Sequence, residues 1–292
     1  MSPDTHRPEA AMSTSPPSTP PGDLPADLPV DLGTPNVRWS VDGGIATCTI
    51  DRPERRNAMT GAMYLAVRTA VGIMNASSDV HALIITGTGD SFCPGGDLSG
   101  GGNDSEGLRV ALAAFGNQIT PYELIRRSAK PVVAAINGTC QGGGLLTAMV
   151  CDVVIASDRA TFRVPEVVRG VADTNFAAYL PAHIGVARAR DLILTGRRFD
   201  AEEAFALGVV SRIVPHDELL AAARAAAVDL VRGAPEARRI MKRIVNDRYG
   251  DVDSMALDAS IRGPEAREGF TAFVEHRAPA WIPEGFEPDG RL

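Results

Sequence analysis

Residues 131–145 read PVVAAINGTCQGGGL, a short apolar run followed by a turn rich in glycine. Five apolar residues in succession, at 132–136, are typical of a strand that is buried on both faces. Gly142, Gly143 and Gly144 then stand directly before a helical pattern that starts at Leu145. A glycine turn at the start of a helix exposes backbone N–H groups, and the helix dipole there favours a negatively charged ligand atom. The stretch therefore predicts a strand, an anion site and a helix in succession.

A second stretch upstream has the same order. Residues 82–87 (ALIITG) form an apolar run, and residues 91–98 (SFCPGGDL) follow it with the pair Gly95-Gly96. A single glycine turn is explained by a tight bend alone, whereas two such turns favour a shared ligand site without requiring one. Further strands are expected at 152–156 and 209–214, with helices between the strands. Strands separated by helices need crossover connections, so the sequence predicts an α/β core.

The chain divides into three parts by composition. Residues 1–35 hold nine of the 21 prolines and few large apolar side chains, which predicts a disordered tail. A hairpin at 37–50, turning at Asp42-Gly43-Gly44, opens a core expected to span residues 36–215. The remainder, 216–292, is expected to be helical, with helices at 217–232, 235–248 and 254–277. A further helix should begin at Asp200, which can cap it, with Glu203 completing a capping box.

Composition limits the classes of function. The 292 residues are 45% hydrophobic, which is enough to bury a full core. No run of about 18 apolar residues and no secretory signal occurs, so we expect a cytoplasmic protein without a membrane partner. A net charge of −7 makes nucleic acid a poor partner. The four cysteines form no CxxC pair, so neither a metal site nor a disulfide framework is expected.

Several motifs follow one another in a fixed order along the chain. They are residues 51–58, 92–98, 130–138, 142–144, 151–152, 162–166, 194–196 and 268–277. From residue 37 to residue 281 this series resembles the crotonase family, also called enoyl-CoA hydratase/isomerase. The resemblance implies a spiral of ββα units with a C-terminal helical trimerisation region, assembled as a homo-trimer or a dimer of trimers. It also implies an acyl-CoA thioester substrate and no cofactor besides the CoA that the substrate carries.

The resemblance also assigns catalytic roles. Gly96 and Gly143 match the two residues whose backbone N–H groups hold the thioester oxyanion. Glu166, in the Val-Pro-Glu of residues 164–166, matches the later of two catalytic carboxylates in the hydratases. Leu146 stands where the earlier carboxylate would be, and leucine cannot transfer a proton. The two-carboxylate hydration of a double bond therefore loses one participant.

Asp173 lies in a loop that departs from the family pattern. It falls near a position where some relatives place a catalytic acidic residue, including the nucleophile of 4-chlorobenzoyl-CoA dehalogenases. Without the resemblance, Asp173 is explained equally well as an N-cap of the following helix, and Glu166 as a solvated loop carboxylate. For each of the two residues, the catalytic and the structural interpretation stay open from the sequence.

Five residues match positions that contact CoA in relatives: Arg55, Arg56, Pro94, Phe273 and His276. The two arginines are expected beside the nucleotide phosphates and Phe273 near the adenine, although an exposed basic patch also explains the arginines. His276 stands where many hydratases have a lysine, and its weaker charge near neutral pH shifts the expected phosphate contact toward Arg277.

Three functions fit these residues. The first is an isomerase-like or hydratase-like enzyme of enoyl-CoA, with Glu166 as proton carrier. The second is a specialised acyl-CoA hydrolase or dehalogenase that uses Asp173. The third is a non-catalytic acyl-CoA-binding subunit that kept the oxyanion turns. Turnover of any acyl-CoA separates the two enzymes from the third alternative, whereas the acyl group depends on the loop at 99–107 and cannot be read from the sequence.

Overall fold

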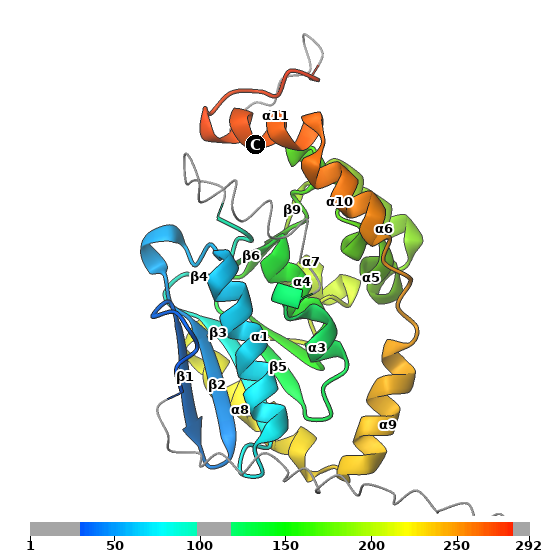
Figure 1. Ribbon diagram of the computed structural model, residues 1–292. Helices are drawn as coiled ribbons and strands as arrows, with labels where there is room; N and C mark the ends of the chain where they lie inside the picture. Colours follow the sequence, from blue (N-terminus) through cyan, green and yellow to red (C-terminus); the bar gives the residue numbers. More distant parts are fainter. Residues whose placement is uncertain (1–29, 98–117, 283–292) are drawn as a thin grey trace, which may run out of the picture.

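The computed structural model describes residues 30–97 and 118–282. Most of the tail expected at 1–35 and the whole loop expected at 99–107 lie outside these residues. In the described part, two β-sheets are surrounded by helices, and the C-terminal helices extend to one end of the molecule (Figure 1).

The two sheets share the chain in an alternating way. The larger has the order β1 (Val37–Asp42), β2 (Ile45–Ile50), β3 (Ala82–Gly87), β5 (Val132–Ile136), β7 (Val153–Ser157) and β10 (Arg212–Val214). The smaller has the order β4 (Ser91–Cys93), β6 (Thr139–Gln141), β8 (Thr161–Arg163) and β9 (Arg198–Asp200). From β3 to β8, successive strands alternate between the two sheets. In the pairs β3 and β4, β5 and β6, and β7 and β8, the first strand belongs to the larger sheet and the second to the smaller. The chain thus winds as a spiral of ββα units, with parallel pairing between successive units.

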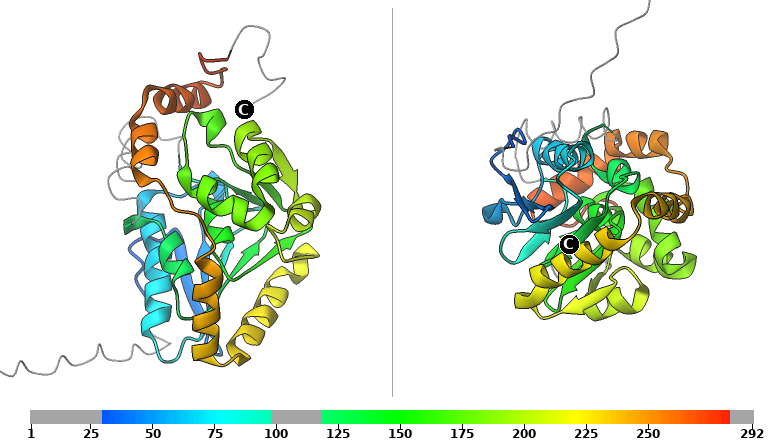
Figure 2. Two further views of the ribbon diagram at one scale, coloured as in Figure 1. Left: turned by 90° about the vertical axis from the view of Figure 1, so that its right-hand side faces the viewer. Right: turned by 90° about the horizontal axis from the view of Figure 1, so that it is seen from below.

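The apolar run of β5 is buried on both faces, as its sequence predicts. Val132, Ala134 and Ile136 belong to the core cluster on the α1 (Gly61–Ala76) side of the sheet. Val133 and Ala135 belong to the cluster with α8 (Leu219–Arg232) on the opposite side. Figure 2 shows α8 crossing beneath the sheet, on the face away from α1. Because both faces are covered, alternation of polar and apolar residues is absent from this strand.

The N-terminal hairpin is confirmed. β1 and β2 pair antiparallel, and Gly43 and Gly44 turn the chain with φ of 52° and 75°. The next helix, α1, begins where Thr60 accepts a hydrogen bond from the Met63 N–H. The helix before β5 is α3 (Tyr122–Arg126), and α4 (Gly143–Met149) follows β6. The α4 helix begins two residues earlier than expected, inside the triple glycine.

The remaining helices enclose the second half of the chain. They are α5 (Thr174–Ile184), α6 (Val186–Thr195), α7 (Ala201–Leu207), α9 (Pro235–Asn246), α10 (Ser254–Arg262) and α11 (Pro264–Val274), with short 3-10 turns η1 (Pro53–Arg55), η2 (Val167–Arg169) and η3 (His216–Glu218). Asp200 caps α7 as expected, by accepting from the Glu203 N–H. The capping box is not completed, because the Glu203 carboxylate binds Arg197 instead.

Two sequence-based boundaries are wrong. The single helix expected at 254–277 is two helices, because Pro264 has no N–H to continue α10 and Gly263 before it is extended, with ψ of 168°. Of the strand expected at 209–214, only the second half forms a strand, β10 (Arg212–Val214). The N–H groups of Val209 and Val210 instead bind the Ala204 carbonyl at the end of α7.

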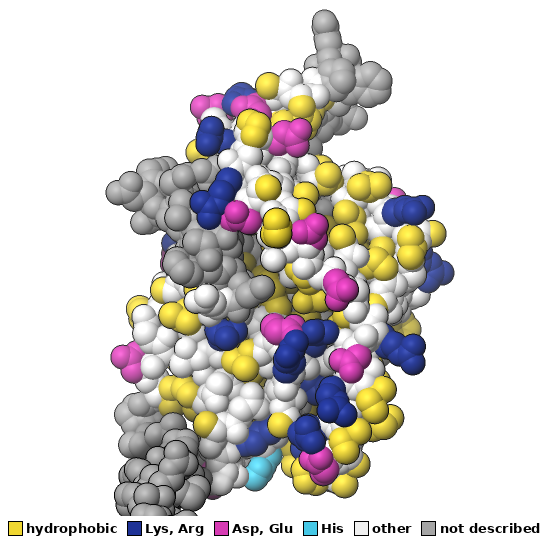
Figure 3. Space-filling model, turned by 45° about the vertical axis from the view of Figure 1, so that its right-hand side comes forward, with side chains coloured by type: hydrophobic (Ala, Val, Ile, Leu, Met, Phe, Trp, Pro, Cys, Tyr) yellow, Lys and Arg dark blue, Asp and Glu magenta, His cyan; other side chains and the backbone are white. Residues whose placement is uncertain are grey.

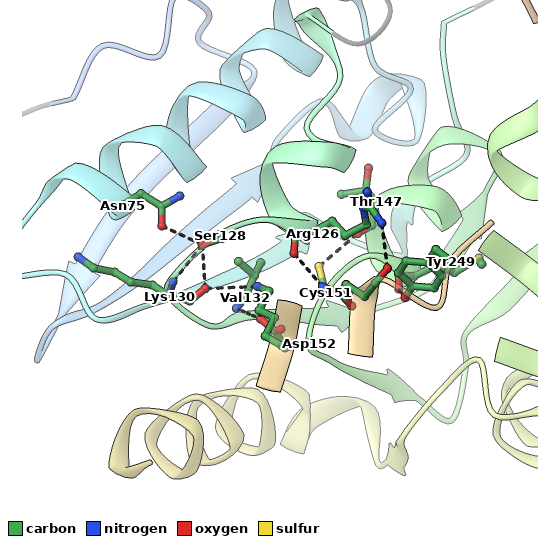
Figure 4. A network of polar contacts seen from close by, with 12 residues as sticks. Asn75, Arg126, Ser128, Lys130, Val132, Thr147, Cys151, Asp152 and Tyr249 are labelled. Atoms are coloured by element: carbon green, nitrogen blue, oxygen red, sulfur yellow. Dashed lines mark hydrogen bonds and ion pairs between the residues drawn. The ribbon is translucent and has the colours of Figure 1, made fainter. Parts of the chain in front are cut away.

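A buried ion pair joins α9 to the core. The Asp152 carboxylate accepts from the Val132 N–H at 2.7 Å (Figure 4). It also accepts from Lys242 Nζ at 2.8 Å, and the Lys242 side chain is only 8% exposed. At the end of α9, Asn246 exchanges hydrogen bonds with the backbone and side chain of Arg126. The helix is therefore fixed through polar contacts, while part of its apolar face stays on the surface.

The four cysteines are free and buried. None of the helices in the described part of the chain combines the length and apolar character that crossing a membrane requires.

Candidate active site

The two glycine turns meet in space. Strands β4 and β6 pair in parallel, so the turns that follow them lie side by side. A β-carbon on Gly144 would lie 2.3 Å from the Cys93 carbonyl oxygen, and one on Gly95 would lie 3.5 Å from the Gly143 nitrogen. A side chain at Gly144 would collide with the first turn, whereas Gly95 is required by its φ of 108° and not by lack of space. The structure thus brings the turns predicted from the sequence into one place.

Both turns present unused backbone donors. The first turn pairs with Met59 as a strand would. The Met59 N–H donates to the Gly95 carbonyl, and the Asp97 N–H donates to the Met59 carbonyl, each at 2.9 Å. This pattern leaves the N–H of Gly96 outside the contact, and Gly143 is the first residue of α4. Neither N–H donates a hydrogen bond to another described residue. Two free N–H groups from adjoining turns are the arrangement that stabilises a developing oxyanion.

The motif at residues 51–58 braces the first turn. Arg52 reaches across to Asp97 at 2.6 Å and to the Ala58 carbonyl at 3.1 Å. Asn57, which is fully buried, donates to the carbonyl of Thr88 before β4 and to that of Ser91, the first residue of β4. These residues hold the geometry of the Gly95-Gly96 turn. The family resemblance includes this motif but does not indicate this role.

Glu166 lies beside the second turn. Its Oε1 is 2.8 Å from the position that a β-carbon on Gly142 would take, so glycine is needed there both for this contact and for a φ of 51°. Its Oε2 is buried and has no hydrogen-bond partner among the described residues. Buried carboxylate oxygens are seldom left unpaired, so this atom is free to act on a ligand at the turn.

Burial raises the pKa of Glu166 well above its usual range, and the nearby Asp173 carboxylate raises this pKa further. The cations Arg169 and Arg163 act in the opposite direction and lower it. A carboxyl group with a raised pKa is a stronger base when ionised, which favours acceptance of a proton.

Asp173 caps α5, as one of the two open interpretations predicted. Its Oδ1 accepts from the backbone N–H of Asn175 at 3.0 Å and from the Asn175 amide at 2.8 Å. Burial raises its own pKa. Since its charge also acts on Glu166, the cap and an electrostatic role at the site are compatible.

Two tyrosines close the other side of the second turn. A β-carbon on Gly143 would lie 2.1 Å from Tyr64 Oη and 2.8 Å from Tyr122 Oη. Tyr64 comes from α1 and Tyr122 from α3, so both are distant from the turn in sequence. Tyr64 directly follows Met63 of the apolar stripe on α1, and nothing in that pattern separates it from a core residue. Leu146, also buried, lies one helical turn into α4 and carries no polar atom.

The residues matched to CoA lie on separate elements. Arg55 and Arg56 are exposed at η1, beside the start of α1, whereas Phe273 and His276 are at the end of α11, at the far end of the molecule in Figure 1. The Arg169 guanidinium covers the Phe273 ring at 3.5 Å. Arg277 is paired with Glu268 and Glu275, so its charge is balanced within the chain. Pro94 is half-buried in the first glycine turn.

The α11 helix also touches the turn that carries Glu166. A β-carbon on Gly269 would lie 2.2 Å from the Arg169 carbonyl oxygen, and one on Gly170 would lie 2.4 Å from that of Glu265.

Among the described residues, no three His, Cys, Asp or Glu side chains gather so that they could hold a metal ion.

Comparison with known proteins decides the family. The model of the family described as enoyl-CoA hydratase/isomerase matches residues 40–284. This chain belongs to the enoyl-CoA hydratase/isomerase family. The resemblance stated from the sequence is thereby confirmed, and so is the prediction of an acyl-CoA enzyme with the crotonase fold.

Individual relatives agree with this assignment. The chain is 35% identical to mevalonyl-coenzyme A hydratase sidH of Aspergillus fumigatus, over 82% of this chain and 92% of that protein. It is 35% identical to the probable enoyl-CoA hydratase echA8 of Mycobacterium tuberculosis, over 82% and 94%. Among solved structures, carnitinyl-CoA hydratase from Mycobacterium avium is similar, with a TM-score of 0.69, 30% identity and coverage of 84% and 98%.

Proposed function

We propose that this member of the enoyl-CoA hydratase/isomerase family binds the thioester carbonyl oxygen of an acyl-CoA between the N–H groups of Gly96 and Gly143. Glu166 then moves a proton at the α or γ carbon. The observation that carries the proposal is the Glu166 carboxylate beside Gly142, with one buried oxygen unpaired. The proposed proton carrier thus lies beside the second glycine turn, which supplies one of the two oxyanion donors, and the first turn adjoins it.

The chemistry follows from this arrangement. Removing a proton next to a thioester moves charge onto the carbonyl oxygen and forms an enolate. Backbone donors that are already oriented stabilise this charge without reorganisation, and losing one of them costs on the order of 100- to 1,000-fold in similar sites. The raised pKa of Glu166 suits the transfer, since the carboxyl group can hold the proton between two steps.

Isomerase-like and hydratase-like reactions share the enolate, which isomerisation forms by removal of a proton and hydration forms by addition of water to the β carbon. Double-bond migration needs one principal carboxylate, which returns the proton at a different carbon. Water addition by the two-carboxylate route needs a second group, and Leu146 cannot serve as one. The family relatives named hydratases leave water addition open, with Glu166 as its only carboxylate proton carrier.

The remaining parts of the proposal concern binding and assembly. CoA contacts are assigned to Arg55, Arg56, Pro94, Phe273 and His276, with no cofactor beyond the substrate's own CoA. We place the enzyme in the cytoplasm, as a homo-trimer or a dimer of trimers. Hydrophobic side chains reach the surface at many points of the face in Figure 3, and α9 exposes Met241, Ile244 and Val245, which supports burial against a second copy.

The test is a panel of saturated, 2-enoyl- and 3-enoyl-CoA substrates in deuterated water. We expect deuterium to enter the α carbon of at least one saturated acyl-CoA, and a 3-enoyl-CoA to be isomerised. Mass spectrometry reads both outcomes. A protein that binds acyl-CoA but exchanges no hydrogen and converts no substrate would instead be the non-catalytic subunit.

A further inference from the structure

The Tyr64 hydroxyl occupies the place where any side chain on Gly143 would begin. Its oxygen is 2.1 Å from that ideal β-carbon position, and its ring carbon Cζ is 3.1 Å from it. Tyr64 is 2% exposed, and its ring extends from α1 into the space next to the second glycine turn. Gly143 therefore has to be glycine because a phenol group fills this space.

The Tyr122 hydroxyl lies next to that of Tyr64 at the same position. The Tyr122 hydroxyl donates to the Gly143 carbonyl at 3.4 Å and meets the same β-carbon position at 2.8 Å. Among the hydrogen bonds of the described residues, none has Tyr64 Oη donating to a backbone carbonyl or a carboxylate. Its hydrogen bond is instead with the Tyr122 hydroxyl, and a phenol hydroxyl that makes one hydrogen bond still has capacity for another to a ligand.

The polar groups around the turn are arranged on two sides. The Glu166 carboxylate lies against Gly142, and the two phenol groups lie against Gly143, the next residue. Leu146 supplies no polar atom between them. Burial raises the pKa of Tyr64 most, and the Glu166 and Asp173 carboxylates raise this pKa further.

The phenol groups are suited to hydrogen bonding and not to proton removal. Burial raises the pKa of Tyr64 and that of Tyr122 well above the usual range, so both stay neutral at physiological pH. A neutral hydroxyl can donate one hydrogen bond and accept another. It can therefore hold an oxygen atom of a ligand in place while a carboxylate moves the proton.

We propose that Tyr64 hydrogen-bonds the oxygen that is added to or removed from the β carbon of the acyl chain, and that Tyr122 positions Tyr64. This inference rests on the proposed function of Glu166 and the glycine donors. Tyr64 would thereby supply the polar contact to the added oxygen that Leu146 cannot make.

The step balances with one carboxylate. Water held by Tyr64 bonds through its oxygen to the β carbon of a 2-enoyl-CoA, and its proton passes to ionised Glu166. The electron pair of the double bond moves to the thioester oxygen, which the N–H groups of Gly96 and Gly143 stabilise. Glu166 then returns the proton to the α carbon as the carbonyl re-forms, which gives a 3-hydroxyacyl-CoA.

Tyr64→Phe separates this role from the rest of the mechanism. Two reactions are measured for each variant: water addition to crotonyl-CoA, and deuterium exchange at the α carbon of butyryl-CoA, which involves no oxygen at the β carbon. We expect water addition to fall by about 10- to 100-fold, as when a reacting group loses its positioning, and α exchange to stay within about threefold. Tyr122→Phe is expected to lower water addition less than Tyr64→Phe does.

Tyr179→Phe is the matched control. Tyr179 is also buried and also loses only a hydroxyl, but it packs against Tyr249, away from the glycine turns. It should leave both reactions unchanged, and melting temperatures establish that each variant folds. The role of Tyr64 would be overturned if Tyr64→Phe lowered both reactions equally or left water addition unchanged. It would also be overturned if the wild type catalysed α exchange but never added water. Absence of α exchange in the wild type would overturn the proposed function itself.

Discussion

Glu166 and Gly142 are in direct contact: Oε1 of the carboxylate lies 2.8 Å from where a β-carbon on the glycine would be. The contact places a buried acid one residue away from the free N–H of Gly143. In the proposed mechanism, proton transfer by Glu166 and oxyanion stabilisation by Gly143 would take place next to each other.

Asp173→Asn should move the acid limb of the pH profile of kcat/KM toward lower pH. The reaction begins with ionised Glu166, so activity rises as pH passes the pKa of this group. The Asp173 charge raises that pKa, and removing the charge lowers it. Asparagine keeps the cap of α5, because its side-chain oxygen can still accept from Asn175. Asp191→Asn, which changes an exposed carboxylate paired with Arg197, is the control and should leave the limb in place. An unmoved limb in Asp173→Asn would contradict the electrostatic coupling.

Gly143→Pro should lose activity on every acyl-CoA tested, because proline removes the N–H that the oxyanion needs. The structure also shows that any β-carbon at this position collides with Tyr64 Oη. Gly143→Ala is therefore the matched control, since it adds the same β-carbon but keeps the N–H. We expect the proline variant to be at least about 100-fold slower than the alanine variant in α exchange. Equal rates in two folded variants would remove Gly143 from the oxyanion site.

Hydration of crotonyl-CoA should be slow relative to isomerisation or α exchange, because Leu146 replaces the first carboxylate. We expect kcat/KM for hydration to stay well below the diffusional ceiling of about 10⁸ M⁻¹s⁻¹. Steady-state assays of both reactions on one preparation provide the comparison. Hydration near the ceiling would mean that Glu166 and the neutral groups suffice for full efficiency.

Lys242→Met should destabilise the fold without acting on the site. It leaves the Asp152 carboxylate buried without its cation, a loss of about 3–5 kcal/mol in the free energy of unfolding. Asp152→Asn in the same chain should recover part of the loss, because the amide oxygen can still accept from the Val132 N–H. Urea unfolding curves measure both effects. A single variant as stable as the wild type would show that the pair contributes nothing.

The sequence was informative where local pattern decides the structure. The buried run at 132–136 predicted β5, and the triple glycine predicted the start of α4, because strand burial and turn geometry depend on neighbouring residues. The split between α10 and α11 could have been predicted as well, since Pro264 after Gly263 disfavours a continuous helix.

The site was predictable only in part. Gly96, Gly143 and Glu166 were identified through resemblance, and the structure shows the two turns meeting beside the carboxylate. Tyr64 and Tyr122 were missed because their place depends on how α1 and α3 pack against α4. Such tertiary contacts leave no periodic signal, and a tyrosine beside an apolar stripe looks like any core residue.

Deuterium uptake at the α carbon of a saturated acyl-CoA, compared between the wild type and Glu166→Gln, tests the central claim most directly. Glutamine keeps the shape of the side chain and cannot carry the proton. We predict rapid uptake by the wild type and no uptake above background by the variant, with CoA-ester affinity within a few fold. A folded Glu166→Gln protein that exchanges the hydrogen at the wild-type rate would contradict the account.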